Sequence, residues 1–247
     1  MIRQFYGQMR MSFSGPLRAR SRPFWGPVHR CARTTLTTIQ PSPEAARIAP
    51  TPIVFLSARK LNGNKAASEL WSAFIEAASS HGFESLLLDL DPDSLPSDSS
   101  SSVLDAFEGE MATSLRHAAA FPPVLFCRDH ASIVGEKYAS SNGLSALVLI
   151  DPAISVVDAI NDSTKHMLPT PLEEFNFEPR FPCKIAWSSR HIEKIEQSLK
   201  DNAGPRLHRI EDELIEEGEQ DGRIVWADAD VDGPEEIRMW LEKECGL

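Results

Sequence analysis

The chain has 247 residues, of which 42% are hydrophobic and 25% are charged. This composition is typical of a folded globular protein, and it excludes a wholly disordered chain. The longest apolar runs are far too short to cross a bilayer, so we expect no transmembrane segment. The four cysteines lack the spacing of a zinc site or a disulfide framework, and we therefore expect reduced thiols and no bound metal.

Charge is distributed unevenly along the chain. The first 43 residues contain seven arginines and no aspartate, glutamate or lysine. The remaining residues hold 18 of the 25 basic side chains and all 36 acidic ones, which gives this part a net charge of −18. An acidic body repels phosphate backbones, so we expect no nucleic-acid partner.

The arginine-rich, acid-free start is typical of a mitochondrial transit peptide. Apolar residues recur there at helical spacing, at Ile2, Phe5, Tyr6, Met9 and Phe13. A secretory signal is disfavoured because no long apolar core is present, and the other interpretation is a disordered basic tail. We expect residues 1–40 to be a transit peptide outside the fold, cleavage between about residues 30 and 45, and a location in the mitochondrial matrix.

Residues 41–247 alternate between strand and helix patterns. Short apolar runs predict strands over 53–56, 86–88, 124–127, 146–150, 184–187 and 206–210. Apolar residues at helical spacing predict helices over 64–81, 102–118, 132–140, 192–199 and from 234 onward. In these helices Asn64 is placed as an N-cap and Pro234 at the first helical position.

Alternating strands and helices need crossover connections. They predict a three-layer α/β/α sandwich with a mostly parallel central sheet of about six strands. In such sheets the functional crevice lies at the carboxyl ends of the strands. The residues to inspect there are 57–63, Asp89, 128–132, Asp151, 188–191 and the segment after 210.

Three segments occur in the order known from one enzyme superfamily. Residues 122–139 read PPVLFCRDHASIVGEKYA, residues 145–153 read SALVLIDPA, and residues 233–244 read GPEEIRMWLEKE. This set resembles the α/β-hydrolases, in which a strand, a nucleophile elbow and a helix precede another strand and a final helix. The resemblance covers about residues 50–247. It implies an α/β-hydrolase-like domain that lacks the family's first two strands and has a short, irregular, lid-like insertion at 152–182.

The elbow departs from the GxSxG pattern of the family. Cys127 stands in place of the first glycine, Asp129 in place of the nucleophilic serine, and Ala131 in place of the second glycine. Cysteine and alanine are small, so we expect the sharp turn to persist without the serine hydroxyl. The family's acid corresponds to the Ser-Ser-Arg-His run at 188–191, and its histidine to Arg223 or Ala227, depending on the alignment.

Three weak candidates for an unorthodox site remain open. Asp129 would be a nucleophile of the kind found in haloalkane dehalogenases and epoxide hydrolases, with His191 as the substitute base. Ser132 would be a nucleophile with His191 or His208 as its base, or otherwise a helix cap. Cys127 would be a reactive thiol, or otherwise an inert buried one.

We therefore expect a catalytically degenerate α/β-hydrolase-like mitochondrial protein with no cofactor. Its predicted role is that of a structural, binding or assembly component, with another mitochondrial protein or complex as partner. The alternative is a hydrolase of ester, thioester or Asp-nucleophile type with an unorthodox active site. A catalytic member of the family should place a carboxylate after the fifth strand and a histidine after the sixth, and the sequence shows neither.

Overall fold

The computed structural model describes residues 34–96, 98–153, 166–172, 180–188, 229–243 and 245–247, and the backbone of 224–226. All of these residues belong to one unit, Ala32–Leu247. Within these ranges no helix combines the length and the apolar character needed to span a bilayer.

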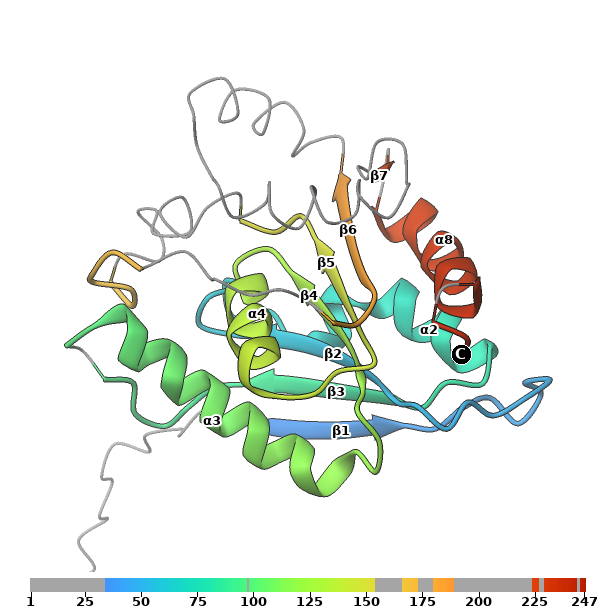
Figure 1. Cartoon of the computed structure of the whole chain (residues 1–247), viewed down its shortest axis with the longest axis horizontal. Helices are drawn as coiled ribbons and strands as arrows, with labels where there is room; N and C mark the ends of the chain where they lie inside the picture. The colour runs from blue at the N-terminus through green and yellow to red at the C-terminus, as the bar shows by residue number, and fades with distance from the viewer. Residues whose placement is uncertain are drawn as a thin grey trace, which may run out of the picture. The chain divides into compact units, whose positions relative to one another are not determined.

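A single sheet forms the centre of the described structure. Its strands are β1 (Thr35–Ile39), β2 (Ile53–Ala58), β3 (Ser85–Leu90), β4 (Val124–Arg128), β5 (Ala146–Ile150), β6 (Cys183–Ser188) and β7 (Ile224–Trp226). They lie in the order β1-β3-β2-β4-β5-β6-β7 (Figure 1). Every neighbouring pair is parallel except β1 and β3, which are antiparallel. The predicted, mostly parallel sheet is confirmed.

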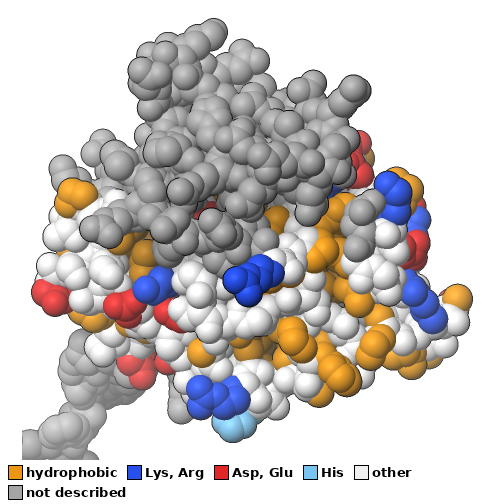
Figure 2. Space-filling view, in the orientation of Figure 1, with side chains coloured by type: hydrophobic (Ala, Val, Ile, Leu, Met, Phe, Trp, Pro, Cys, Tyr) orange, Lys and Arg blue, Asp and Glu red, His pale blue; other side chains and the backbone are white. Residues whose placement is uncertain are grey.

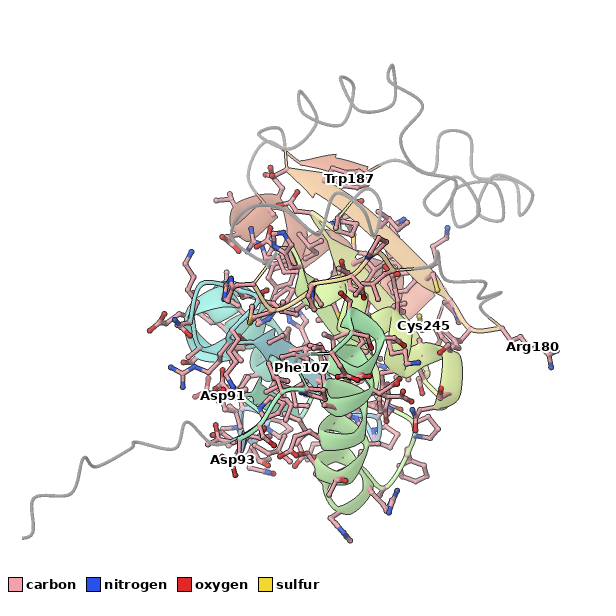
Figure 3. All side chains as sticks on the ribbon, turned by 90° about the vertical axis from the view of Figure 1, so that its left-hand side faces the viewer. Asp91, Asp93, Phe107, Arg180, Trp187 and Cys245 are labelled. Carbon is pink, nitrogen blue, oxygen red and sulfur yellow. The ribbon has the colours of Figure 1, made fainter. Side chains whose placement is uncertain are left out.

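Helices pack on both faces of this sheet. They are α1 (Ala67–Leu70), α2 (Ser72–Ser80), α3 (Ser100–Ala118), α4 (Ala131–Ser141) and α8 (Ala229–Lys243). Side chains of α3 and α4 share one core cluster with the sheet, and side chains of α1, α2 and α8 share another (Figure 1). Phe107 projects from α3 toward the sheet and is fully buried (Figure 3). The three-layer α/β/α arrangement is therefore present.

The central strands are apolar along their whole length because both of their faces are covered. Every residue of β2 and of β5 is buried. On β4, Leu125 belongs to the cluster beneath α3 and α4, and Phe126 to the cluster beneath α2 and α8. Continuous apolar runs of this kind require helices on both sides of the sheet.

The predicted helix over 64–81 is interrupted at Trp71. The Trp71 indole N–H donates to the carbonyl oxygen of Leu56 at 2.9 Å, and its ring contacts Phe55, Phe74 and Phe126 at centroid distances of 5.6–5.9 Å. This buried anchor separates the short α1 from α2. Trp71 thus joins the first crossover to the centre of the sheet.

Asn64 does not cap this helix, contrary to the prediction. It has a left-handed backbone with φ of 63°, and α1 begins three residues later. The cap comes instead from the end of β3, where an Asp89 carboxylate oxygen accepts the Ala67 N–H at 2.8 Å. Burial raises the pKa of Asp89 above its ordinary value, and the Ala67 bond opposes that rise.

Residues 166–172, which lie in the segment predicted to be a lid-like insertion, are attached to α3. Within residues 166–172, Leu168 is fully buried, and Thr170 exchanges hydrogen bonds with Ser100. In each of these two bonds a backbone N–H donates to the other residue's hydroxyl at 2.9 Å. The described residues of 166–172 and 180–182 form no helix or strand. This part of the insertion therefore packs against the domain.

Three features differ from the sequence prediction. Residues 35–39, which were expected to lie outside the fold, form strand β1 and pair with β3. The last helix begins at Ala229, which is buried, so Pro234 lies inside the helix and not at its first position. The seventh strand, β7, was not predicted. The strand and helix expected at 206–210 and 192–199 lie outside the described residues.

Strand β4 gives a direct test of where the core lies. Leu125 is completely buried, whereas Phe121, just before the strand, is 56% exposed. We expect Leu125→Ala to lower the free energy of unfolding by about 2–5 kcal/mol, because it leaves a cavity between the sheet and α4. Phe121→Ala, the control, should change it by less than about 0.5 kcal/mol. Equal effects in urea unfolding experiments would show that the centre of the sheet is misplaced.

Strand β1 gives a second test, at the boundary of the domain. Thr34 Oγ1 accepts the Asp91 N–H at 3.0 Å, and Leu36 and Ile39 pack against the two core clusters. A chain that starts at residue 40 should lose on the order of 2 kcal/mol of stability relative to one that starts at residue 34. Equal unfolding midpoints would show that β1 is dispensable.

Candidate crevice at the carboxyl ends of the strands

The polar side chains of interest gather where β2 and β4 end. The sheet order places β3 on one side of β2 and β4 on the other. The direction in which strands are added to the sheet therefore reverses between β2 and β4. Ligand sites in open parallel sheets lie at such a point, outside the carboxyl ends of the strands. The residues there come from the turns after β2, β4, β5 and β6.

A sharp strand-to-helix turn with Asp129 at its apex follows β4. Asp129 has a left-handed backbone with φ of 52°. Its N–H donates to the Ile150 carbonyl at 3.1 Å, and its own carbonyl accepts the Ser132 N–H at 3.1 Å. Left-handed backbone is uncommon for residues other than glycine, although aspartate tolerates it better than most. The chain thus has the geometry of a nucleophile elbow with a carboxylate at its apex.

The elbow brings α4 unusually close to β4. A Cβ atom added to Gly135 would lie 2.2 Å from the Cys127 sulfur and 3.3 Å from the Cys127 Cβ. Cys127 and Ala131 are both fully buried. The cysteine at the position of the first glycine in the GxSxG pattern is therefore accommodated by a glycine about one turn into the adjacent helix.

Cys127 is poorly suited to act as a reactive thiol. Complete burial raises the pKa of its thiol well above the ordinary value, and the negative charge of Glu136 raises it further. The thiolate is the nucleophilic form, so the sulfur stays protonated at neutral pH. The geometry favours an inert, packed cysteine.

Ser132 lies inside α4 and caps nothing. The helix starts at Ala131, and its N-cap residue is His130, which makes no capping bond through its side chain. Ser132 is fully buried, and its Oγ has no hydrogen-bond partner among the described residues. The bases proposed for it, His191 and His208, lie outside the described residues.

Arg128 connects the elbow to the last helix. Its guanidinium lies 2.8 Å from an Asp230 carboxylate oxygen in the first turn of α8, and it donates to the Leu70 carbonyl at 3.4 Å. The Asn62 amide donates to the Arg128 carbonyl at 3.4 Å. Arg128 therefore pairs with Asp230. Arg223, one of the two residues aligned with the family's histidine, lies outside the described residues.

A second left-handed aspartate follows the neighbouring strand. Asp151 has φ of 48°, and its N–H donates to the Ala186 carbonyl at 2.9 Å. One Asp151 carboxylate oxygen accepts the Ser188 N–H at 2.6 Å. Arg128 pairs with Ile150 in the sheet, so Asp129 and Asp151 follow neighbouring strands at the same level. Asp151 links the ends of β5 and β6.

Internal contacts also occupy the turns after β2 and β3. The Lys60 ammonium lies 2.9 Å from an Asp91 carboxylate oxygen and donates to the Pro92 carbonyl at 2.7 Å (Asp91 is labelled in Figure 3). The Ser57 hydroxyl donates to the Lys65 carbonyl at 2.7 Å. Asn62 is buried, and its Oδ1 lacks a partner in the described part of the chain.

The sequence predicted the positions at these strand ends but not several of their contacts. It singled out Asp89 and Asp151 as strand-end residues, yet the Ala67 and Ser188 N–H groups that they accept could not be foreseen. Gly135 gave a signal, a glycine within a helix where alanine is ordinarily preferred. Across the described residues, no three His, Cys, Asp or Glu side chains come together as a metal site.

Comparisons with known proteins identify the fold. No model of a known family and no curated protein matches the sequence. Among solved structures, XC6422 from Xanthomonas campestris, described as an α/β serine hydrolase without a lid, is 11% identical, has a TM-score of 0.51 and aligns over 85% of this chain and 86% of that one. An α/β serine hydrolase homologue from Coxiella burnetii is 10% identical, with a TM-score of 0.50 over 84% and 89% of the two chains. The chain therefore has an α/β-hydrolase fold, as the sequence resemblance predicts.

The contact between Cys127 and Gly135 can be tested by a double-mutant cycle. Gly135→Ala should destabilise the protein by about 1–3 kcal/mol, because the new methyl group overlaps the sulfur. The same change in a Cys127→Ala background should cost about 1 kcal/mol less, since the sulfur is gone. Gly109→Ala is the matched control: Gly109 lies in α3 with open space around it, and alanine should stabilise there by about 0.5–1 kcal/mol. Additive effects at 127 and 135 would contradict the predicted contact.

Proposed function

We propose that the domain is a non-catalytic α/β-hydrolase-like protein that acts as a structural, binding or assembly component. The observation that carries this proposal is the use made of the polar side chains at the strand ends. Arg128 joins α8, Asp89 caps α1, and Asp151 joins β6. Each of these side chains contributes to a connection within the fold.

The chemistry of the elbow supports the same conclusion. Acyl transfer by this fold needs a nucleophile, a base and a group that orients the base, and these parts act as a unit. When the nucleophile or its base is lost, what remains is only about 10³–10⁴-fold over the uncatalysed rate. Here a carboxylate stands at the serine position, and the neighbouring serine and cysteine are buried.

One observation favours a second candidate, a hydrolase with Asp129 as its nucleophile. The aspartate stands at the apex of a correctly formed elbow, with φ of 52°. In such chemistry one carboxylate oxygen attacks an electrophilic carbon, the leaving group departs with the electron pair of the broken bond, and water then hydrolyses the resulting ester. That last step needs a base to activate the water.

Substrate turnover distinguishes the two candidates. The chain should be assayed with activated esters, thioesters, epoxides and haloalkanes, and we expect no rate above background. Asp129→Asn is a suitable comparison because asparagine also tolerates the left-handed backbone, and Ser132→Ala and Cys127→Ala test the other candidates. Mass spectrometry of the protein after exposure to a haloalkane should show no ester at Asp129. Turnover that one of these substitutions abolishes would establish an enzyme and overturn the non-catalytic proposal.

We place this function in mitochondria, with another mitochondrial protein or complex as partner. The proposal is supported by the seven arginines and the absence of acidic residues in the first 43 positions. Because Thr34 and β1 contribute to the sheet, processing should leave them in place. Mass spectrometry of the protein from purified mitochondria should therefore find a new N-terminus between about residues 30 and 34. An intact Met1 in the organelle, or a cytosolic location, would contradict this assignment.

A further inference from the structure

Strand β1 is an uncovered edge of the sheet in the described part of the chain. It is the last strand in the order, and its inner side pairs with β3 over five consecutive residues without a bulge. Thr35, Thr37 and Thr38 are exposed. An edge strand presents unpaired N–H and C=O groups on its outer side, which can extend the sheet with a further strand.

The sequence of this edge lacks the features that usually prevent such pairing. Proteins protect their edge strands with lysine, proline, bulges or inward-pointing charges. Strand β1 reads TLTTI and contains none of these features, since Pro41 and Pro43 lie after its last residue. The run 34–43 carries no charged residue, in a chain that is 25% charged. Threonine and isoleucine favour extended structure. The edge is therefore well suited to pairing.

We propose that β1 pairs with β1 of a second copy of this chain about a two-fold axis at Thr37. Antiparallel pairing of a strand with itself places Thr37 opposite Thr37 of the second copy, Thr35 opposite Ile39, and Leu36 opposite Thr38. A strand that pairs with itself brings any charge close to a like charge, which destabilises the pair, and β1 carries none. A charged partner strand would find no opposite charge on β1.

This pairing closes on itself and joins the two sheets into one. Two-fold symmetry uses the same surface on both copies, so assembly stops at the dimer. Cross-strand pairs of threonine with threonine, and of threonine with isoleucine or leucine, are of the kind that stabilise antiparallel strands. A five-residue strand pair is smaller than a standard interface of roughly 1,600 Å², so the dimer should form reversibly with concentration. Pairing through β1 does not depend on whether the residues at the carboxyl ends of the strands are catalytic.

The first experiment is sedimentation velocity on the full 247-residue chain over a range of concentrations. We expect a concentration-dependent dimer. Thr37→Lys should weaken it at least tenfold, because two ammonium groups then face each other at the axis. Thr113→Lys is the matched control, since Thr113 is exposed on α3 and the charge change is the same. Far-UV circular dichroism and the thermal midpoint should show that both variants remain folded.

The second experiment tests the register of the pair. In a background with Cys31→Ser and Cys245→Ser, Thr37→Cys should form an intermolecular disulfide on mild oxidation. Directly opposed residues have Cβ atoms about 4.5–5.5 Å apart, close to the reach of a disulfide. Thr38→Cys is the comparison: residue 38 lies opposite Leu36, so the two cysteines are offset along the strands and should cross-link far less. The remaining Cys127 and Cys183 are buried.

Three outcomes would overturn the proposal. The first is a monomer at every concentration. The second is a dimer that Thr37→Lys leaves unchanged, which would direct attention to the exposed apolar side chains of α8, Val231 and Met239. Hydrophobic side chains also gather on the lower right of the face shown in Figure 2. The third is equal cross-linking at residues 37 and 38, which would show contact without the predicted register.

Discussion

The close approach of α4 to β4 is the constraint on which the elbow depends. The chain must leave β4, turn through a left-handed residue at Asp129 and enter a helix that lies against the same strand. Such a turn requires small residues where the helix and strand meet. Here Cys127 occupies more space on the strand side, and Gly135 supplies the missing space on the helix side. The elbow can thus retain its backbone shape while its side chains differ from those of the family, so its shape alone is weak evidence for catalysis.

The carboxylates at the carboxyl end of the sheet form contacts within the fold in the described structure. Asp89 accepts the N–H group at the start of α1, and Asp151 accepts the N–H of Ser188 at the end of β6. Asp230 receives the guanidinium of Arg128 and so ties the start of α8 to the elbow. Carboxylates that accept backbone N–H groups at helix starts and strand ends stabilise the fold through charge-assisted hydrogen bonds. A side chain held in this way has lost much of the freedom to bind a substrate.

The predictability of each part follows from the range of the interactions that form it. Strands buried on both faces, such as β2 and β5, could be predicted because burial on both faces requires an apolar residue at every position, and such a run is visible within the strand's own sequence. Strand β1 was missed because its threonines alternate with only two apolar residues, Leu36 and Ile39, and because the arginine-rich segment precedes it directly. The cap of α1 was assigned to Asn64 because a local rule was applied, whereas the carboxylate that caps it lies 22 residues away in the sequence. Contacts between distant residues, Arg128 with Asp230 above all, leave no local pattern in the sequence.

The same distinction explains how a fold can persist without the chemistry that it usually supports. The hydrophobic terms that form the sheet are spread over dozens of side chains, so the loss of a few polar residues at its edge barely changes them. Catalysis depends on three or four groups held in mutual register, and replacement of one removes most of the rate. An α/β-hydrolase fold can therefore be retained at 10–11% identity to serine hydrolase structures, whether or not a triad is present. If the domain is non-catalytic as proposed, the apex of the elbow still has to adopt a left-handed backbone, and Asp129 meets that requirement.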